Sequence, residues 1–363
     1  MEKESPARGT RTIKKGFCLK SLLIVIVIIA AISIVSLVFY WQYTKFPTPK
    51  NPVSKKYEWQ FRGKAYALEE TLYQSTDGYY QKKPKGIFSN FEEISLNKYF
   101  KTPTEDNTVD NITKKLQDIA SKSNLTADQA VDLAVSYVQS LPYDEARART
   151  DLTHPRYPYE TLYEKTGICS DKSLLMVAIL RKMGYGASIF MYEKDQHMAA
   201  AVQCSSQYSN YNSGYCIAET TAIGHKIGII PELDQGSLQA VQRSEVQNFK
   251  SDNTSNRQNK VLSDPKIYAK TQGKTYGGVL QTLTNEKEVE QLSNYFETQK
   301  LVIEQKENEL DSMTTELDRF KARKDYPGYN KLVPSYNNLV VTIRNLIDEY
   351  NTKVARYNLL IKE

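Results

Sequence analysis

Residues 167–184 read GICSDKSLLMVAILRKMG and combine a cysteine with the start of an amphipathic helix. Helical spacing runs from Asp171 to Met183, and Gly184 supplies a helix stop signal. The apolar side chains that share one helix face are Leu174, Leu175, Ala178 and Ile179. Cys169 stands at the helix start, where unpaired backbone N–H groups and the positive end of the helix dipole favour a thiolate. The same N–H groups are suited to stabilise an oxyanion on a substrate.

Three segments after this helix are predicted to be strands, namely residues 187–192, 198–204 and 215–221. His197 lies just before the second segment, and Glu219 lies within the third. Adjacent antiparallel strands would place this imidazole beside this carboxylate, which fixes the imidazole tautomer and stabilises the imidazolium. With Cys169 as nucleophile, the three side chains form the arrangement that nucleophilic acyl transfer needs. The alternative is a small buried cysteine and a structural histidine.

The sequence around these three residues resembles the transglutaminase-like superfamily. Three stretches of this chain are similar to the family's first signature block: YPYETL at 157–162, GICSDKSLL at 167–175, and the residues at 180 and 184–185. The second and third blocks are similar to HMA at 197–199 and AETT at 218–221, in the family's order. VQSLPY at 138–143 extends the resemblance upstream, and in all it covers residues 57–235.

This resemblance implies an α+β fold with a papain/transglutaminase-like core, in which the nucleophile helix packs on an antiparallel sheet. It implies that Cys169 is the nucleophile, His197 the base and Glu219 the orienting acid, a position commonly held by Asp in the superfamily. The implied activity is hydrolysis or transfer of acyl groups at amide bonds of a protein or peptide substrate. Related sequences often have acidic residues on both sides of the cysteine, where this chain has Ile168 and Ser170. A catalytically inactive scaffold is therefore the alternative.

Metal, cofactor and nucleic-acid sites find no support in the sequence. The chain has four cysteines and three histidines, but no CxxC, no HExxH, no carboxylate cluster with metal-loop spacing and no phosphate-binding glycine loop. We therefore expect no cofactor and no metal. The net charge is +6, and residues 1–20 carry +4 of it beside an apolar segment. A nucleic-acid-binding protein would concentrate basic charge on its folded part, so no nucleic-acid partner is expected.

Residues 21–40 contain no charged side chain. Twenty helical residues extend about 30 Å, the thickness of the hydrocarbon core of a membrane. Basic residues precede this segment and an aromatic cluster follows it, which favours a cytoplasmic N-terminus. We predict a basic cytoplasmic tail at 1–20, a transmembrane helix at 21–41 and a spacer at 42–56, with the main domain on the extracytoplasmic side of the cell membrane. The alternative, a cleaved signal peptide, would have a shorter apolar region and a small-residue cleavage site.

The predicted transglutaminase-like domain comprises residues 57–250. Its first part, residues 57–80, is expected to form a hairpin or two short strands, with turns at 63–64 and 76–78. Helical spacing then predicts helices at 108–120 and 126–140, and Thr126 with Gln129 fits a capping box. A long proline-containing loop follows at 141–159. Its arginines, Arg147, Arg149 and Arg156, would either meet an acidic substrate or lie solvated.

Cys204 and Cys216 flank the polar loop at 205–214, which joins two predicted strands. Residues equidistant from the centre of a hairpin face each other, so a disulfide between them is geometrically reasonable. An extracytoplasmic location would permit this bond. The alternative is a pair of buried thiols.

The C-terminal residues 285–363 differ from the rest of the chain, and a linker at 251–284 is expected to precede them. Apolar residues recur in steps of three and four on two successive segments, with polar Gln299 and Lys306 as exceptions in the first segment. This heptad spacing predicts two long helices. A break at 326–328, Tyr-Pro-Gly, favours an antiparallel coiled-coil hairpin that folds as a unit. The alternatives are packing of these helices on the preceding domain or association with a partner.

Overall fold

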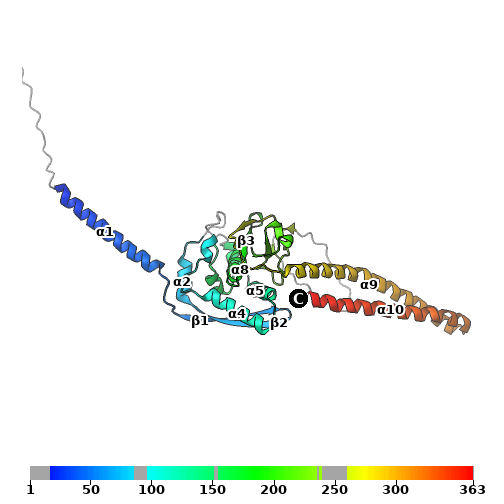
Figure 1. The fold of residues 1–363 in the computed structure, drawn as a ribbon. Coiled ribbons are helices and arrows are strands. Elements are labelled where there is room, and N and C mark those ends of the chain that lie inside the picture. The colour runs from blue at the N-terminus through cyan, green and yellow to red at the C-terminus, as the bar shows by residue number, and fades with distance from the viewer. Residues whose placement is uncertain (1–16, 86–95, 151–153, 235–236, 239–259, 363) are drawn as a thin grey trace, which may run out of the picture. The chain divides into compact units, whose positions relative to one another are not determined.

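The computed structural model describes residues 17–85, 96–150, 154–234, 237–238 and 260–362 (Figure 1). Most of the predicted basic tail, residues 1–16, lies outside this description, as do residues 239–259 around the predicted start of the linker. The chain divides into two compact units with the boundary between Thr48 and Pro49, and each is described by itself.

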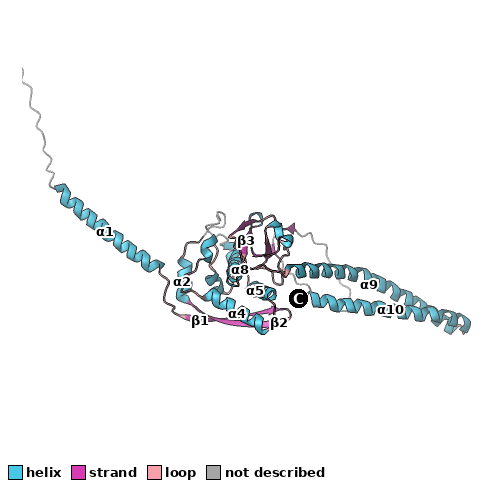
Figure 2. Cartoon of the chain, viewed as in Figure 1, coloured by secondary structure: helices cyan, strands magenta, loops and turns pink. Residues whose placement is uncertain are grey.

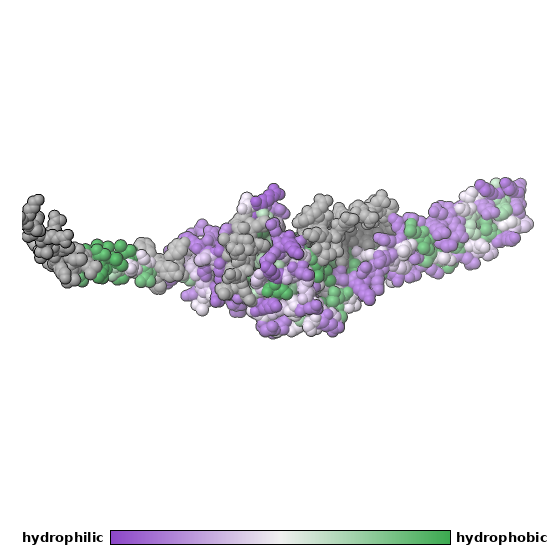
Figure 3. Space-filling view, turned by 90° about the horizontal axis from the view of Figure 1, so that it is seen from above, coloured by the Kyte–Doolittle hydropathy of each residue, from purple (hydrophilic) through white to green (hydrophobic). Residues whose placement is uncertain are grey.

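The first unit contains one long helix, α1 (Phe17–Thr44), which extends beyond both ends of the predicted segment at 21–41. Over residues 23–37 its large apolar side chains are exposed, with Leu23 57% and Leu37 65% accessible. Figure 3 shows this stretch as a hydrophobic surface. Among the residues that the structure describes, no helix combines the length and the hydropathy needed to cross a membrane.

The second unit is built around a four-stranded antiparallel sheet in the order β5-β4-β3-β9. These strands are β3 (Ala187–Tyr192), β4 (His197–Gln203), β5 (Tyr215–Ala218) and β9 (Lys266–Tyr268). Helix α8 (Cys169–Lys182) packs on β3 and β4, which confirms the α+β arrangement of helices on an antiparallel sheet. Strand β9 comes from the segment that we expected to be a linker. It pairs with the otherwise open edge of β3, where Ile189 lies opposite Tyr268.

The remaining elements surround α8 or extend from the sheet. The helices are α2 (Gln74–Lys82), α4 (Thr108–Lys122), α5 (Ala127–Ser140), α6 (Glu145–Thr150) and α7 (Pro158–Glu164). The short strands β6 (Glu232–Asp234), β7 (Ser237–Leu238) and β8 (Lys260–Val261) form a separate sheet. Helix α8 contacts α4, α5 and α7 as well as the sheet, so residues 174–177 are fully buried rather than forming one apolar stripe.

A long hairpin of β1 (Pro52–Phe61) and β2 (Lys64–Tyr73) confirms the predicted hairpin and begins inside the expected spacer. Its two-residue turn has positive φ at both positions, 50° at Arg62 and 70° at Gly63, as a type I′ turn requires. The turn predicted at 76–78 is wrong. Those residues lie in α2, where Gln81 Nε2 donates to Asp77 Oδ2 at 2.7 Å across one helical turn.

Local signals placed the other upstream elements well. Thr126 and Gln129 form the predicted capping box at the start of α5: Gln129 N donates to Thr126 Oγ1 at 3.2 Å, and Thr126 N donates to Gln129 Oε1 at 3.0 Å.

The disulfide between Cys204 and Cys216 is also confirmed, with a Cα–Cα distance of 5.8 Å. The two cysteines do not face each other directly, however. Cys216 pairs with Val202, so the bond runs diagonally between the strands.

The C-terminal helices α9 (Val279–Ala322) and α10 (Tyr326–Leu360) pack against each other, as predicted, in a long hairpin (Figure 2). Phe296 anchors its core, with ring centroids 5.1 Å from Tyr350 and 5.7 Å from Tyr357. The helices break at 323–325 rather than at the predicted 326–328. Proline is tolerated in the first helical turn, and the Asp325 side chain accepts from Gly328 N at 3.0 Å to cap α10.

Candidate active site

The structure brings the three predicted site residues together at one end of the sheet. Cys169 is the first residue of α8 and is 3% exposed. His197 is the first residue of β4 and is also buried. Glu219 is fully buried and follows β5 directly. The observed strand ends at Ala218, so Glu219 lies one residue after it rather than within it. Because β4 and β5 are neighbours, the ends of both strands lie beside the start of α8.

Glu219 uses both of its carboxylate oxygens. Oε2 lies 2.8 Å from His197 Nε2. Oε1 accepts from Thr220 N at 2.8 Å, from Thr221 N at 2.7 Å and from the Thr221 hydroxyl at 2.6 Å. Burial raises the pKa of Glu219, but the His197 charge and these donors outweigh it and lower that pKa to about 2. Glu219 is therefore an ionised acceptor in a fixed position for the Nε2 atom of the imidazole.

The surroundings of His197 favour its protonated form. Burial lowers the pKa of this imidazole, but the Glu219 charge and the hydrogen bonds to Cys169 and Glu219 raise it to about 10. Since Nε2 bonds to Glu219, Nδ1 is the ring nitrogen left for the Cys169 sulfur. An imidazolium at this position stabilises a thiolate next to it, which is the form of cysteine that attacks carbonyl carbons.

The N-terminus of α8 is fixed by a buried carboxylate. Asp171 Oδ2 accepts from Ile168 N at 3.1 Å and forms an ion pair with Arg147, while Oδ1 accepts from Arg156 N at 2.7 Å. The Arg156 guanidinium in turn lies 3.1 Å from Asp144. Arg147 and Arg156 are thus largely buried in ion pairs rather than solvated, and they hold the segment before the nucleophile in place.

Tyr143 is a site residue to which the sequence assigned no role. A parallel bridge joins it to Gly167, and Gly167 N donates to Pro142 O at 3.2 Å. A Cβ at Gly167 would lie 2.9 Å from the Asp171 Cβ, so glycine permits this close approach. The Tyr143 phenol hydrogen-bonds to the backbone of Cys169, and burial together with the Cys169 charge raises its pKa above the ordinary range. The only signal in the sequence was its place in the VQSLPY run.

A layer of buried polar side chains lies behind the three site residues. Gln139 Nε2 donates to Glu219 O at 2.8 Å and to His225 O at 2.9 Å, while its Oε1 accepts from Gly224 N at 3.1 Å. Ser173 Oγ donates to Met198 O at 2.9 Å, next to the histidine. These bonds fix the backbone that carries His197 and Glu219. The sequence alone assigns no role to Gln139 or Ser173.

The described residues include no group of three or more His, Cys, Asp or Glu side chains that could hold a metal ion.

A family model described as a transglutaminase-like domain matches residues 107–211, from the residue before α4 into the loop after β4. The matched region includes Cys169 and His197 and ends before Glu219. No curated protein and no solved structure matches the chain.

Proposed function

We propose that this protein is a cysteine enzyme that hydrolyses or transfers acyl groups at amide bonds through Cys169, His197 and Glu219. One observation carries the proposal: a buried imidazole hydrogen-bonds to a buried carboxylate at 2.8 Å and to the thiol at the start of a helix. A nucleophile, a base and an orienting acid in this order are the components of covalent acyl transfer.

In the proposed reaction the Cys169 thiolate attacks the amide carbonyl carbon. The oxyanion that forms accepts hydrogen bonds from N–H groups in the first turn of α8, next to the Tyr143 phenol. His197 then gives its proton to the leaving amine, and the C–N bond breaks to leave a thioester. Water or an acceptor amine attacks the thioester, His197 takes its proton, and the thiolate is released. Glu219 remains ionised throughout and keeps the imidazole oriented.

The experiment combines an activity-based thiol probe with assays of amide hydrolysis and amine incorporation on peptides. Cys169→Ala is expected to abolish labelling and activity, and His197→Ala to reduce both by about a thousandfold or more. Ser188→Ala is the matched control, because its hydroxyl is fully buried on β3 and has no hydrogen-bond partner among the described residues. A Cys169→Ala protein with full activity would refute the mechanism.

The proposed location is outside the cytoplasm, with the chain anchored through its N-terminal apolar helix. The charge-free run at 21–40 supports this topology, as does the disulfide between Cys204 and Cys216, which persists in oxidising compartments. Protease added to intact cells should therefore degrade the chain beyond the anchor and spare the N-terminal tail. Complete protection of the domain would overturn the orientation.

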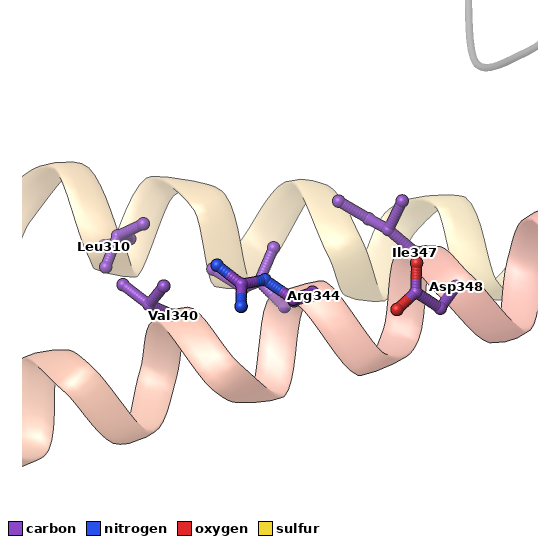
Figure 4. Close-up of a pocket in the computed structure, with 6 residues that line it drawn as sticks. Leu310, Val340, Arg344, Ile347 and Asp348 are labelled. Carbon is purple, nitrogen blue, oxygen red and sulfur yellow. The ribbon is translucent and has the colours of Figure 1, made fainter.

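A second candidate function, partner binding without catalysis, is favoured by the surface of the helical hairpin. An apolar groove between α9 and α10 is lined by Leu310, Val340, Ile343 and Ile347, together with Arg344 and Asp348 (Figure 4). Neither Arg344 nor Asp348 has an ion-pair partner among the described residues. Two copies packed antiparallel about a two-fold axis near residue 346 would pair each Arg344 with the other copy's Asp348. The partner proposed for this groove is therefore a second copy of the chain.

Charge reversal tests this association in the full chain in detergent. Arg344→Asp and Asp348→Arg each place like charges across the two-fold axis, so each variant should sediment as a monomer. The double variant, and an equimolar mixture of the two single variants, should restore dimers because opposite charges face each other again. Wild-type protein that is monomeric, or single variants that remain dimeric, would exclude this interface.

A further inference from the structure

Lys172 is a fully buried lysine one helical turn from the proposed nucleophile. Its Nζ donates to two backbone carbonyls, Gln139 O at 3.1 Å and Leu141 O at 2.8 Å. Among the described residues it forms no ion pair. Removing an ammonium group from water costs several kcal/mol in proteins. A charge kept at this position therefore points to a role other than packing.

The carbonyls that Lys172 binds belong to the end of α5 and the start of the segment that leads to the site. The side chain of Gln139 holds the backbone of Glu219, and Leu141 lies two residues before Tyr143. One ammonium group therefore ties the nucleophile helix to the acid on one side and to Tyr143 on the other. The last carbonyls of a helix also carry its negative partial charge, which a cation complements.

The charged groups that face Lys172 are Cys169 on its own helix and Glu219 after β5. From α5 it meets the backbone carbonyl of Gln139, and His197 on β4 bonds to Glu219. Burial lowers the pKa of Lys172 to about 8, while Glu219 and Cys169 act to keep the ammonium charged. A thiolate, an imidazolium and a carboxylate have a net charge of −1, which this cation balances.

We infer that Lys172 is a positioning residue that holds Glu219 and the Tyr143 segment against the nucleophile helix and stabilises the thiolate through its charge. This inference rests on the proposed function of the Cys169 site. It predicts that loss of the charge makes Cys169 less reactive below pH 8, where a neutral environment favours the thiol. Above pH 9 most cysteines are ionised, so the difference should vanish there.

The test measures the rate at which iodoacetamide alkylates Cys169 in the full chain between pH 5 and pH 10, by mass spectrometry of the Cys169 peptide. Lys172→Met should react at least tenfold more slowly than wild type at pH 6.5 and at the wild-type rate above pH 9. Lys172→Arg should stay within about threefold of wild type, because it keeps the charge. Lys182→Met is the matched control, since Lys182 lies at the exposed end of the same helix, paired with Asp110 at 2.7 Å.

A wild-type pH profile in folded Lys172→Met would overturn the inference, as would a folded Lys172→Arg that reacts as slowly as Lys172→Met. If Lys172→Met does not fold, Lys172→Gln replaces it, because glutamine keeps a donor for the Leu141 carbonyl but has no charge; the same tenfold loss is expected. His197→Ala separates the two hypotheses. Reactivity that is independent of His197 defeats the proposed function, whereas reactivity that depends on His197 but not on Lys172 defeats the inference alone.

Discussion

Replacement of Glu219 by glutamine tests the central interaction of the site. Glutamine has nearly the same shape but carries no charge, and its single carbonyl oxygen cannot replace both carboxylate oxygens. The three donors from Thr220 and Thr221 would retain that oxygen, so the amide nitrogen would turn toward His197 Nε2. The imidazole would then have to accept at Nε2. It would lose its imidazolium form and adopt the tautomer that cannot serve as a base for Cys169.

The pKa values set the size of the effect. The pKa of Glu219 falls from 4.5 to about 2 and that of His197 rises from 6.5 to about 10, and both changes describe one pairing. The change at His197 also includes the contribution of Cys169, and the smaller change at Glu219 includes that of Thr221. At about 1.36 kcal/mol per pKa unit, the carboxylate stabilises the imidazolium by about 3 kcal/mol, which corresponds to a roughly 200-fold change in its population.

The assay is alkylation of Cys169 at pH 6.5, together with NMR titration of the His197 ring. Glu219→Gln should slow alkylation by about 100-fold to 200-fold and lower the pKa of His197, since only the contribution of Cys169 then opposes burial. Glu160→Gln is the matched control: Glu160 is another buried carboxylate, but it accepts from Tyr157 N at 2.8 Å and pairs with Lys85 rather than with His197. An alkylation rate in Glu219→Gln within threefold of wild type would refute the role of this carboxylate.

Three further predictions concern stability. The free energy of unfolding should be highest between about pH 4.5 and pH 6.5. The Glu219 contribution is lost as pH falls toward 2, and the His197 contribution is lost as pH rises through 10. Urea titrations at several pH values would measure both losses. Replacing Cys204 and Cys216 together by alanine should lower the free energy of unfolding by about 3 kcal/mol, because the disulfide closes a loop with a sequence separation of 12, and an unchanged melting temperature would contradict this. Residues 279–362 expressed alone should melt cooperatively by circular dichroism, and a non-helical wild-type fragment would exclude independent folding. In this fragment Phe296→Ala should lower the free energy of unfolding by about 3 kcal/mol, whereas Thr298→Ala, at an exposed position, should change it little.

Patterns that extend over a few turns of helix or strand were sufficient to predict much of this fold. The apolar spacing at 126–140 and the capping pair of Thr126 and Gln129 predicted α5, and the heptads predicted both arms of the C-terminal hairpin. Capping and helical periodicity are interactions between residues close in the chain, so the sequence displays them directly. Cys169 at the start of a helix is a signal of the same kind.

Tertiary packing alone decided the features that join distant segments. Strand β9 pairs with β3 across more than seventy residues because an open sheet edge leaves backbone groups unpaired, and no local pattern marks three residues as that partner. The ion pairs of Arg147 and Arg156 form because folding buries Asp171, whose charge must then be compensated. Lys172 likewise looks like an ordinary polar residue in the sequence. Its burial, and its contact with the end of α5, arise only when α8 is enclosed on every side by its neighbours.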